Sequence, residues 1–154
     1  VLHAVIEVWG SDRVGVRLSP YGAFNDMSDK DPIGLFTHVI EQLNPLNLAY
    51  LHLIEPRSTG AGGSDQVVKD VPSTSELFKK VFKGKVIMAG GYDRDSAEAA
   101  VSSGEADAVA FGRLYISNPD LVERFAQNAA LNPYDRSTFY GGTEKGYIDY
   151  PSLT

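Results

Sequence analysis

The chain has 154 residues, of which 43% are hydrophobic and 22% charged, a composition typical of a globular protein with one apolar core. The formal net charge is −6 and no run of Lys or Arg forms a basic patch, which argues against nucleic acid or an anionic membrane as the partner. The absence of cysteine excludes disulfides, thiolate nucleophiles and Cys-ligated metals. No apolar stretch approaches the roughly 18–20 residues of a membrane span and no signal-peptide pattern opens the chain, so we expect a cytoplasmic protein.

The first nine residues, Val1–Trp9, have the apolar spacing of an amphipathic helix, and Gly10 is placed to end it. Val1 is not a methionine, and no N-cap residue precedes the helical pattern. We therefore expect the chain to belong to something longer, through cleavage, a split protein or circular permutation.

Four short apolar runs follow, each succeeded by a polar loop and a helical pattern. The predicted strands are Val14–Leu18, Leu48–Ile54, Val86–Ala89 and Ala108–Phe111. The predicted helices are Pro32–Leu43, Thr74–Phe82, Ser96–Ser102 and Asn118–Asn128, the last with Asn118 as N-cap before Pro119. This alternation predicts an α/β protein with a parallel sheet. An open doubly wound sheet and a (β/α)₈ barrel, of which this chain would supply four of about eight units, both fit the pattern.

The first predicted strand carries a charged residue at an unusual place. With a period of two, the aliphatic residues of Val14–Leu18 share one face, while Gly15 and Arg17 share the other. In a barrel the second face points into the lumen, where a guanidinium is costly unless an anion or several acceptors meet it. Arg17 is therefore a candidate ligand-binding residue, and an ion pair with a carboxylate on a neighbouring strand is the alternative.

Glycines end the third and fourth predicted strands. Gly90 and Gly91 follow one strand and lead to a helix, and Gly112 with Arg113 follows the next. Glycines let a ligand approach the backbone N–H groups, a helix N-terminus favours an anion, and a guanidinium offers forked donors. These four residues predict a phosphate site, with ordinary βα turns as the alternative. No G-x-G-x-x-G fingerprint follows a strand.

Other segments carry weaker signals. The loop Glu55–Val71 is polar and glycine-rich, with the length of a mobile lid. The aromatic tail Asn132–Gly142 could cover a barrel mouth and stack on a planar ligand, or simply pack as a terminal segment. The histidines have no partner at metal spacing, so we predict no metal site.

Several blocks together resemble the C-terminal half of old yellow enzymes, the FMN-dependent NAD(P)H ene reductases that include the plant oxophytodienoate reductases. The blocks are VGVRLSP at Val14–Pro20, Ala89–Gly91, FGRLYISNPDL at Phe111–Leu121, NPYDRSTFY at Asn132–Tyr140 and GYIDYP at Gly146–Pro151. The resemblance implies that residues 1–154 form a single half-barrel, about strands 5–8 of an FMN-binding (β/α)₈ TIM barrel.

The same resemblance implies roles for the candidate residues. Arg17 would contact the pyrimidine side of the flavin, where a cation stabilises negative charge on the reduced ring. Gly90, Gly91, Gly112 and Arg113 would bind the FMN phosphate. Some members of the family have Asn in place of Gly91, which leaves the backbone contact and removes a side-chain contact here.

Phe139 and Tyr140 match the aromatic pair that lies near the dimethylbenzene edge of the flavin or the substrate pocket. No catalytic residue can be assigned, because the family's carbonyl-binding His pair and its tyrosine acid lie on the fourth barrel strand and its loop, which these residues do not include. The chain would hold part of the flavin site without the residues that clamp the substrate carbonyl.

The implied function is hydride transfer from NAD(P)H to FMN N5 and then to the β-carbon of a small enone, complete only with an N-terminal half-barrel in the same or a separate chain. An alternative is a non-catalytic flavin- or phosphate-binding half-barrel that self-associates, since half a barrel leaves open strand edges. A dihydroorotate dehydrogenase-like FMN barrel is a third reading, and the tail motifs speak against it.

Overall fold

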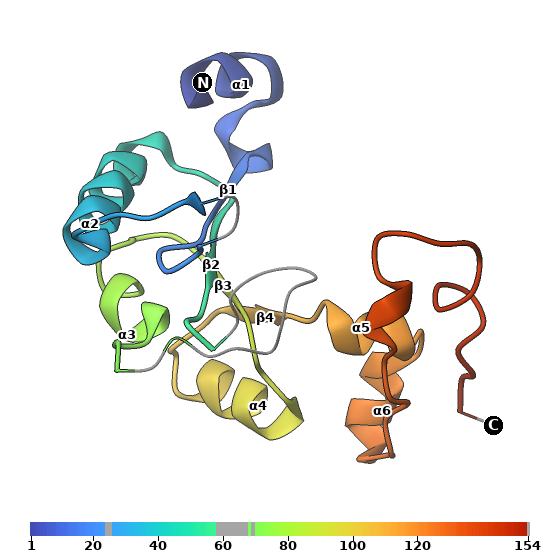
Figure 1. Ribbon diagram of the computed structural model, residues 1–154. Coiled ribbons are helices and arrows are strands. Elements are labelled where there is room, and N and C mark those ends of the chain that lie inside the picture. The colour runs from blue at the N-terminus through green and yellow to red at the C-terminus, as the bar shows by residue number, and fades with distance from the viewer. Residues whose placement is uncertain (24–25, 58–67, 69, 154) are drawn as a thin grey trace. The chain divides into compact units, whose positions relative to one another are not determined.

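The computed structural model describes residues 1–23, 26–57, 68 and 70–153. It divides into two compact units, Val1–Ala110 and Phe111–Thr154. The strands are β1 Gly15–Leu18, β2 Tyr50–Ile54, β3 Val86–Ala89 and β4 Ala108–Ala110, and the helices are α1 Leu2–Trp9, α2 Pro32–Leu43, α3 Thr74–Phe78, α4 Arg94–Ser102, α5 Arg113–Ser117 and α6 Leu121–Gln127 (Figure 1). None of the helices in the described part of the chain has the length and apolar character needed to cross a membrane.

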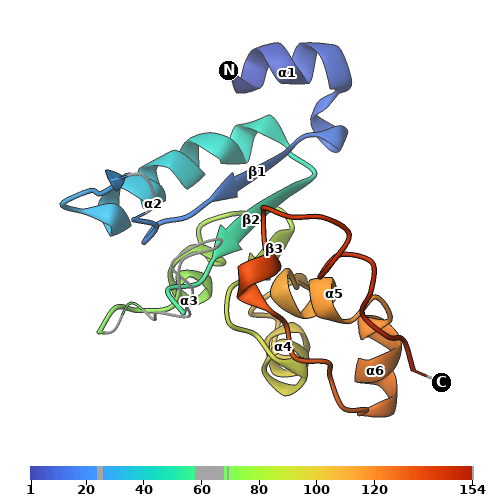
Figure 2. The same ribbon diagram turned by 45° about the vertical axis from the view of Figure 1, so that its right-hand side comes forward.

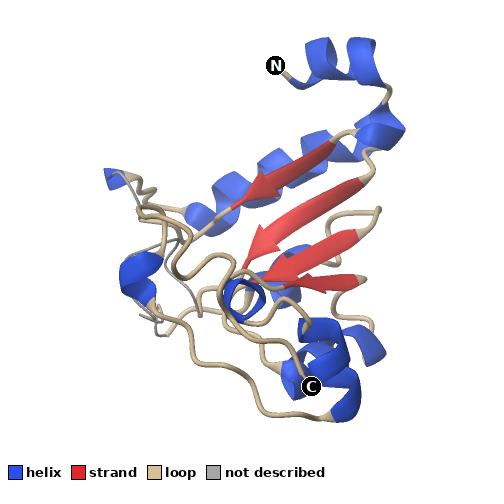
Figure 3. Cartoon of the chain, turned by 90° about the vertical axis from the view of Figure 1, so that its right-hand side faces the viewer, coloured by secondary structure: helices blue, strands red, loops and turns tan. Residues whose placement is uncertain are grey.

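The first unit holds a four-stranded sheet in the order β1-β2-β3-β4, and every neighbouring pair is parallel (Figure 3). The pairing places one row of residues across it: Arg17 opposite His52, His52 opposite Ile87, and Ile87 opposite Ala108. Because side chains alternate along each strand, residues of one row share a face. The predicted parallel sheet is confirmed.

The opposite face of the sheet packs on helices of the same unit. Leu51, Leu53, Val86 and Met88 are fully buried, and so is Phe78 of α3. Burying each large apolar side chain contributes about 1.5–3 kcal/mol, so this layer is the core. Helices α2, α3 and α4 lie on this one side of the sheet (Figures 1 and 2). A doubly wound sheet, with helices on both faces, is therefore not the architecture of this unit.

Three helix boundaries in the first unit differ from the sequence pattern. Helix α1 begins at Leu2, one residue later than predicted. Helix α3 ends at Phe78 instead of Phe82. Beyond this end, the Phe82 N–H still donates a hydrogen bond to the Phe78 carbonyl at 3.0 Å. Helix α4 begins at Arg94, earlier than predicted, because Asp93 forms a capping box with Ser96.

The second unit contains a helix that the pattern did not predict, α5, directly after β4. The predicted cap at Asn118 is wrong, since Asp120 precedes α6. The buried Asn118 amide instead donates to the Leu114 carbonyl at 2.8 Å and accepts from the Asn132 N–H at 2.7 Å. Its side chain therefore joins the end of α5 to the start of the tail.

The end of the chain is fastened to α6 by a buried arginine. The Arg124 guanidinium donates to Asp120 at 2.8 Å, to the Ala130 carbonyl at 2.6 Å and to the Pro151 carbonyl at 2.8 Å. The Leu153 N–H adds a bond to the same Asp120 carboxylate at 2.6 Å. Three hydrogen-bond acceptors explain how a guanidinium only 5% exposed is tolerated.

Candidate functional site

The face of the sheet away from the helices carries Gly15, Arg17, Tyr50 and His52, as the period of two predicts for the first pair. A Cβ at Gly15 would lie 2.4 Å from Cζ of Tyr50, so the tyrosine ring lies directly over the glycine. Arg17 is exposed instead of buried, because the described residues of the first unit leave this face open. Its guanidinium is thus presented to whatever covers the face.

His52, beside Arg17 in the register, was missed by sequence reasoning. Its Nε2 atom is buried and has no hydrogen-bond partner in the part of the chain that the structure describes. Burial, followed by the charge of Arg17, lowers the pKa of His52 below its ordinary value of 6.5. Buried polar atoms are rarely left unpaired, so this nitrogen of a neutral imidazole is a candidate to bond a ligand. The sequence carried no signal for this role, because the register that places His52 beside Arg17 comes from the fold.

The Gly90–Gly91 turn lies at the carboxyl end of β3 and leads into α4. Both glycines have positive φ, 104° and 72°, a backbone region that side chains disfavour. Gly91 is also in close contact with the preceding loop, since a Cβ there would lie 2.9 Å from Cβ of Arg57. In this chain both the backbone conformation and the close approach of Arg57 therefore favour glycine at position 91.

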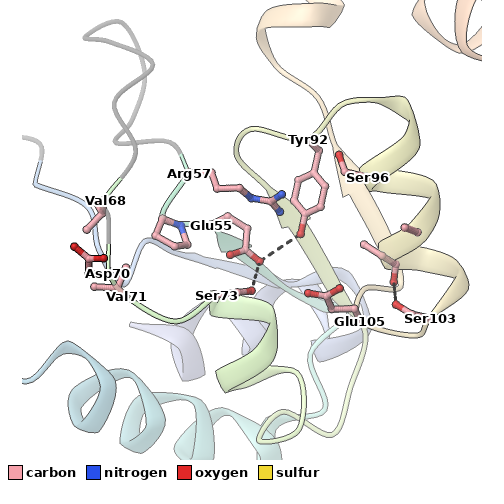
Figure 4. A pocket seen from close by; sticks show the side chains of 13 residues that line it. Glu55, Arg57, Val68, Asp70, Val71, Ser73, Tyr92, Ser96, Ser103 and Glu105 are labelled. Atoms are coloured by element: carbon pink, nitrogen blue, oxygen red, sulfur yellow. Dashed lines mark hydrogen bonds between the residues drawn. The ribbon is translucent and has the colours of Figure 1, made fainter.

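Beside this turn the first unit has a pocket of about 780 Å³ (Figure 4). Its lining includes Glu55, Arg57, Ser73, Tyr92, Ser96 and Glu105. Sequence reasoning assigned no role to Glu55, which looked like one charge among many in a polar loop, yet its side chain is only 1% exposed. The predicted lid in Glu55–Val71 falls mainly on residues 58–67 and 69, which lie outside the described residues. Within the described ranges, no three His, Cys, Asp or Glu side chains gather as metal ligands would.

The second unit gathers its candidates around Tyr134, another residue that sequence reasoning did not single out. The Arg113 guanidinium carbon lies 5.6 Å from the Tyr134 ring centroid, and the Phe139 ring lies 5.8 Å from it. Tyr140, 71% exposed, makes an edge contact with Phe139 at 6.3 Å. Gly112 is exposed with φ −96°, so its backbone conformation does not itself require glycine. Arg113 and the aromatic pair are thus linked through one ring.

Comparison with known proteins gives a consistent match. Residues 1–132 match the family model described as the NADH:flavin oxidoreductase / NADH oxidase family. Over 155 residues the chain is 44% identical to 12-oxophytodienoate reductase 1 of Oryza sativa subsp. japonica. The alignment covers 99% of the chain and 40% of that relative.

Solved structures agree. Morphinone reductase superposes with a TM-score of 0.84 at 43% identity, over 99% of this chain and 39% of its own. The old yellow enzyme from Trypanosoma cruzi gives 0.86 at 36% identity, over 98% and 38%. The chain thus spans about 40% of the length of these relatives, and its parallel sheet is part of their TIM barrel. It belongs to the NADH:flavin oxidoreductase / NADH oxidase family, whose cofactor is FMN.

Proposed function

We propose that the chain is the FMN-binding half of an NAD(P)H-dependent ene reductase, which reduces the C=C bond of α,β-unsaturated carbonyl compounds. The observation that carries the proposal is the pair Arg17 and His52, one cation and one unsatisfied neutral nitrogen side by side on the open face of the sheet. Residues 1–154 form a single half-barrel in this proposal, and catalysis requires the complementary N-terminal half. The relatives, of which the chain covers about 40%, support this division.

The described residues fit FMN on chemical grounds. When bound, FMN supplies hydride transfer from NAD(P)H to the alkene carbon. Arg17 stabilises the negative charge that the pyrimidine side of the reduced ring carries, and His52 supplies a neutral nitrogen beside it. The Gly90–Gly91 turn offers its backbone to the phosphate at the carboxyl edge of the sheet, where barrels of this class commonly bind phosphate.

Residues of the second unit complete the assignment on the basis of the sequence resemblance. Gly112 and Arg113 bind the same phosphate, and Phe139 and Tyr140 lie near the dimethylbenzene edge or the substrate. The ring contacts that join Arg113 to Tyr134 and Phe139 within this unit support a common role for them.

A non-catalytic half-barrel that binds flavin or phosphate and self-associates is the second candidate. The open face of the sheet favours it, because two copies could cover each other there. The two candidates differ in composition and activity. An assembly of two copies of this chain would bind ligand without reducing an enone.

The test uses the complete barrel, meaning this chain together with the barrel half that precedes it or with the corresponding half of morphinone reductase. We expect the complete barrel to be yellow, to lose its flavin absorbance on addition of NADPH, and to reduce cyclohexenone. The chain alone should bind FMN weakly and reduce no enone. Turnover of cyclohexenone by the chain alone would contradict the division of labour, and a colourless barrel would contradict the proposed function.

Within the complete barrel, Arg17→Ala should weaken FMN binding about tenfold or more, because a charge-assisted contact is lost. His38→Ala is the control, since that histidine is exposed on α2, on the other side of the sheet. Both variants are measured by flavin fluorescence titration. Equal affinities for the two variants would remove Arg17 from the site.

A further inference from the structure

The carboxylate of Glu55 connects two segments that follow different strands. It lies directly after β2 and accepts hydrogen bonds from the N–H groups of Thr74, at 3.0 Å, and Ser75, at 3.1 Å, at the start of α3. The Ser73 hydroxyl adds a third bond at 3.1 Å, and the Tyr92 hydroxyl a fourth at 3.3 Å. Four donors stabilise a buried charge that would otherwise be costly. Glu55 thus fixes Tyr92 relative to α3 (Figure 4).

Tyr92 is the residue that follows Gly91, so whatever holds its side chain also restrains the glycine turn. Its side chain is 7% exposed. Burial, and then the nearby Glu55 carboxylate, raises the pKa of Tyr92 to about 12, so the hydroxyl remains a donor at neutral pH. Gly90 and Gly91 have no side chains of their own to limit their conformations. Anchoring Tyr92 is therefore a direct way to order this turn.

Arg57 restrains the turn from its other side. Its guanidinium carbon lies 4.2 Å from the Tyr92 ring centroid, and its Cβ is in contact with Gly91. A guanidinium over a tyrosine ring is a favourable arrangement that also keeps the ring in place. The positive charge of Arg57 also acts on Asp93. The hydrogen bonds from Ser96 are the larger cause, and both effects lower the pKa of Asp93. Arg57 thus lies against both Gly91 and the anchored ring of Tyr92.

We propose that Glu55, Tyr92 and Arg57 are positioning residues that hold the Gly90–Gly91 turn in the conformation that receives the FMN phosphate. This inference rests on the proposed function and extends it, because none of the three residues needs to touch the flavin. The three residues act only on the phosphate end of the cofactor. A residue with a general structural role would instead change the binding of every flavin alike.

The experiment compares FMN with riboflavin, which lacks the phosphate, as ligands of the complete barrel. The main variant is Tyr92→Phe, which removes the hydroxyl donated to Glu55 and keeps the ring under Arg57. We expect FMN to bind about five- to tenfold more weakly, the scale of one typical hydrogen bond, and riboflavin to bind within about twofold of the unmodified protein. The ³¹P resonance of bound FMN should shift as well.

Glu55→Gln should lower the preference for FMN over riboflavin more than Tyr92→Phe does, because the single amide oxygen cannot accept hydrogen bonds from all four donors. If this variant fails to fold, Tyr92→Phe alone decides. Ser102→Ala is the matched control, since it removes a hydroxyl bonded at 2.9 Å to the Glu98 carboxylate on an exposed part of α4. It should leave both affinities unchanged.

The outcomes separate the two proposals. If the unmodified barrel binds FMN no more tightly than riboflavin, the phosphate role of the glycine turn fails. If it prefers FMN and Tyr92→Phe leaves both that preference and the ³¹P resonance unchanged, the positioning role fails while the proposed function stands. A parallel loss of FMN and riboflavin affinity would also refute the positioning role.

Discussion

The two ends of the same sheet use a buried or half-buried carboxylate in different ways. At the carboxyl end, Glu55 joins α3 to the residue after a glycine turn. At the amino end, Asp107 accepts from the Lys79 ammonium, from Lys85 at 2.9 Å and from the Val86 N–H at 2.9 Å. The Asp107 N–H also bonds the Val86 carbonyl at 2.9 Å.

The difference lies in what each carboxylate holds. Asp107 ties together the first residues of β3 and β4, regular backbone that would pair in any case. Glu55 holds a loop and a turn that have no pairing of their own. In barrels of this class the carboxyl end carries function and the amino end stability. Changes at the amino end should therefore alter unfolding, and changes at the carboxyl end ligand binding.

The strongest test of this contrast is Gly91→Ala at the carboxyl end. A side chain there has both an unfavourable φ of 72° and a contact 2.9 Å from Cβ of Arg57. We expect FMN affinity in the complete barrel to fall about a hundredfold, with riboflavin affected much less. Isothermal titration calorimetry measures both.

Gly104→Ala is the matched control, because Gly104 has φ 79° and no atom within 4 Å of an added Cβ. It should cost about 1 kcal/mol of stability and leave FMN affinity unchanged. A similar loss of affinity in both variants would show that backbone strain alone, and not the glycine turn, governs binding.

The second test is Asp107→Asn at the amino end. The hydrogen bond from Lys79, followed by that from the Val86 N–H, holds the pKa of Asp107 well below its ordinary value of 3.8. Its contribution to stability is therefore complete above pH 3.8 and lost as the pH falls below it. We expect Asp107→Asn to lower the free energy of unfolding by about 2 kcal/mol at pH 7 and by much less near pH 2.

Urea unfolding of the chain, followed by circular dichroism at several pH values, measures this difference. Asp95→Asn is the control, since that carboxylate pairs with Arg94 in a position 86% exposed and should matter little. A pH-independent difference for Asp107→Asn, or a loss of FMN affinity in the complete barrel, would contradict the assignment of this residue to stability alone.

The smallest effect is expected for Tyr92 at alkaline pH. Its raised pKa means that the fold favours the neutral phenol, a contribution present below pH 10 and lost as the pH rises through about 12. Burial also raises the pKa of Tyr21, so an absorbance titration at alkaline pH should show two of the eight tyrosines ionising late, and Tyr92→Phe should remove one of the two steps. Two late steps that persist in the variant would contradict the assignment to Tyr92.

The sequence predicted most of the regular structure, because apolar periodicity reports which residues face a core. The strand Val86–Ala89 and the helix Pro32–Leu43 were predicted to the residue. The cap at Asp93 and the role of Asn118 were not predicted, because both depend on which backbone groups are left unpaired after folding.

The candidate site was predictable only in part, for a similar reason. Arg17 and the glycine pair stand at marked positions, a strand interior and a strand end, where charge and missing side chains are unusual. Glu55 and His52 gain their roles from residues far away in the sequence. Glu55 accepts hydrogen bonds from Thr74 and Tyr92, and His52 lies beside Arg17. Spacing along a single sequence carries no signal for such contacts.

The bond from Arg124 to the Pro151 carbonyl has a practical consequence for handling the protein. Removing the last four residues would take an acceptor from a nearly dehydrated guanidinium and leave Asp120 without the Leu153 N–H. An affinity tag should therefore leave Pro151 and Leu153 in place. Trimming the tail to improve crystals should reduce yield, since it would loosen α6.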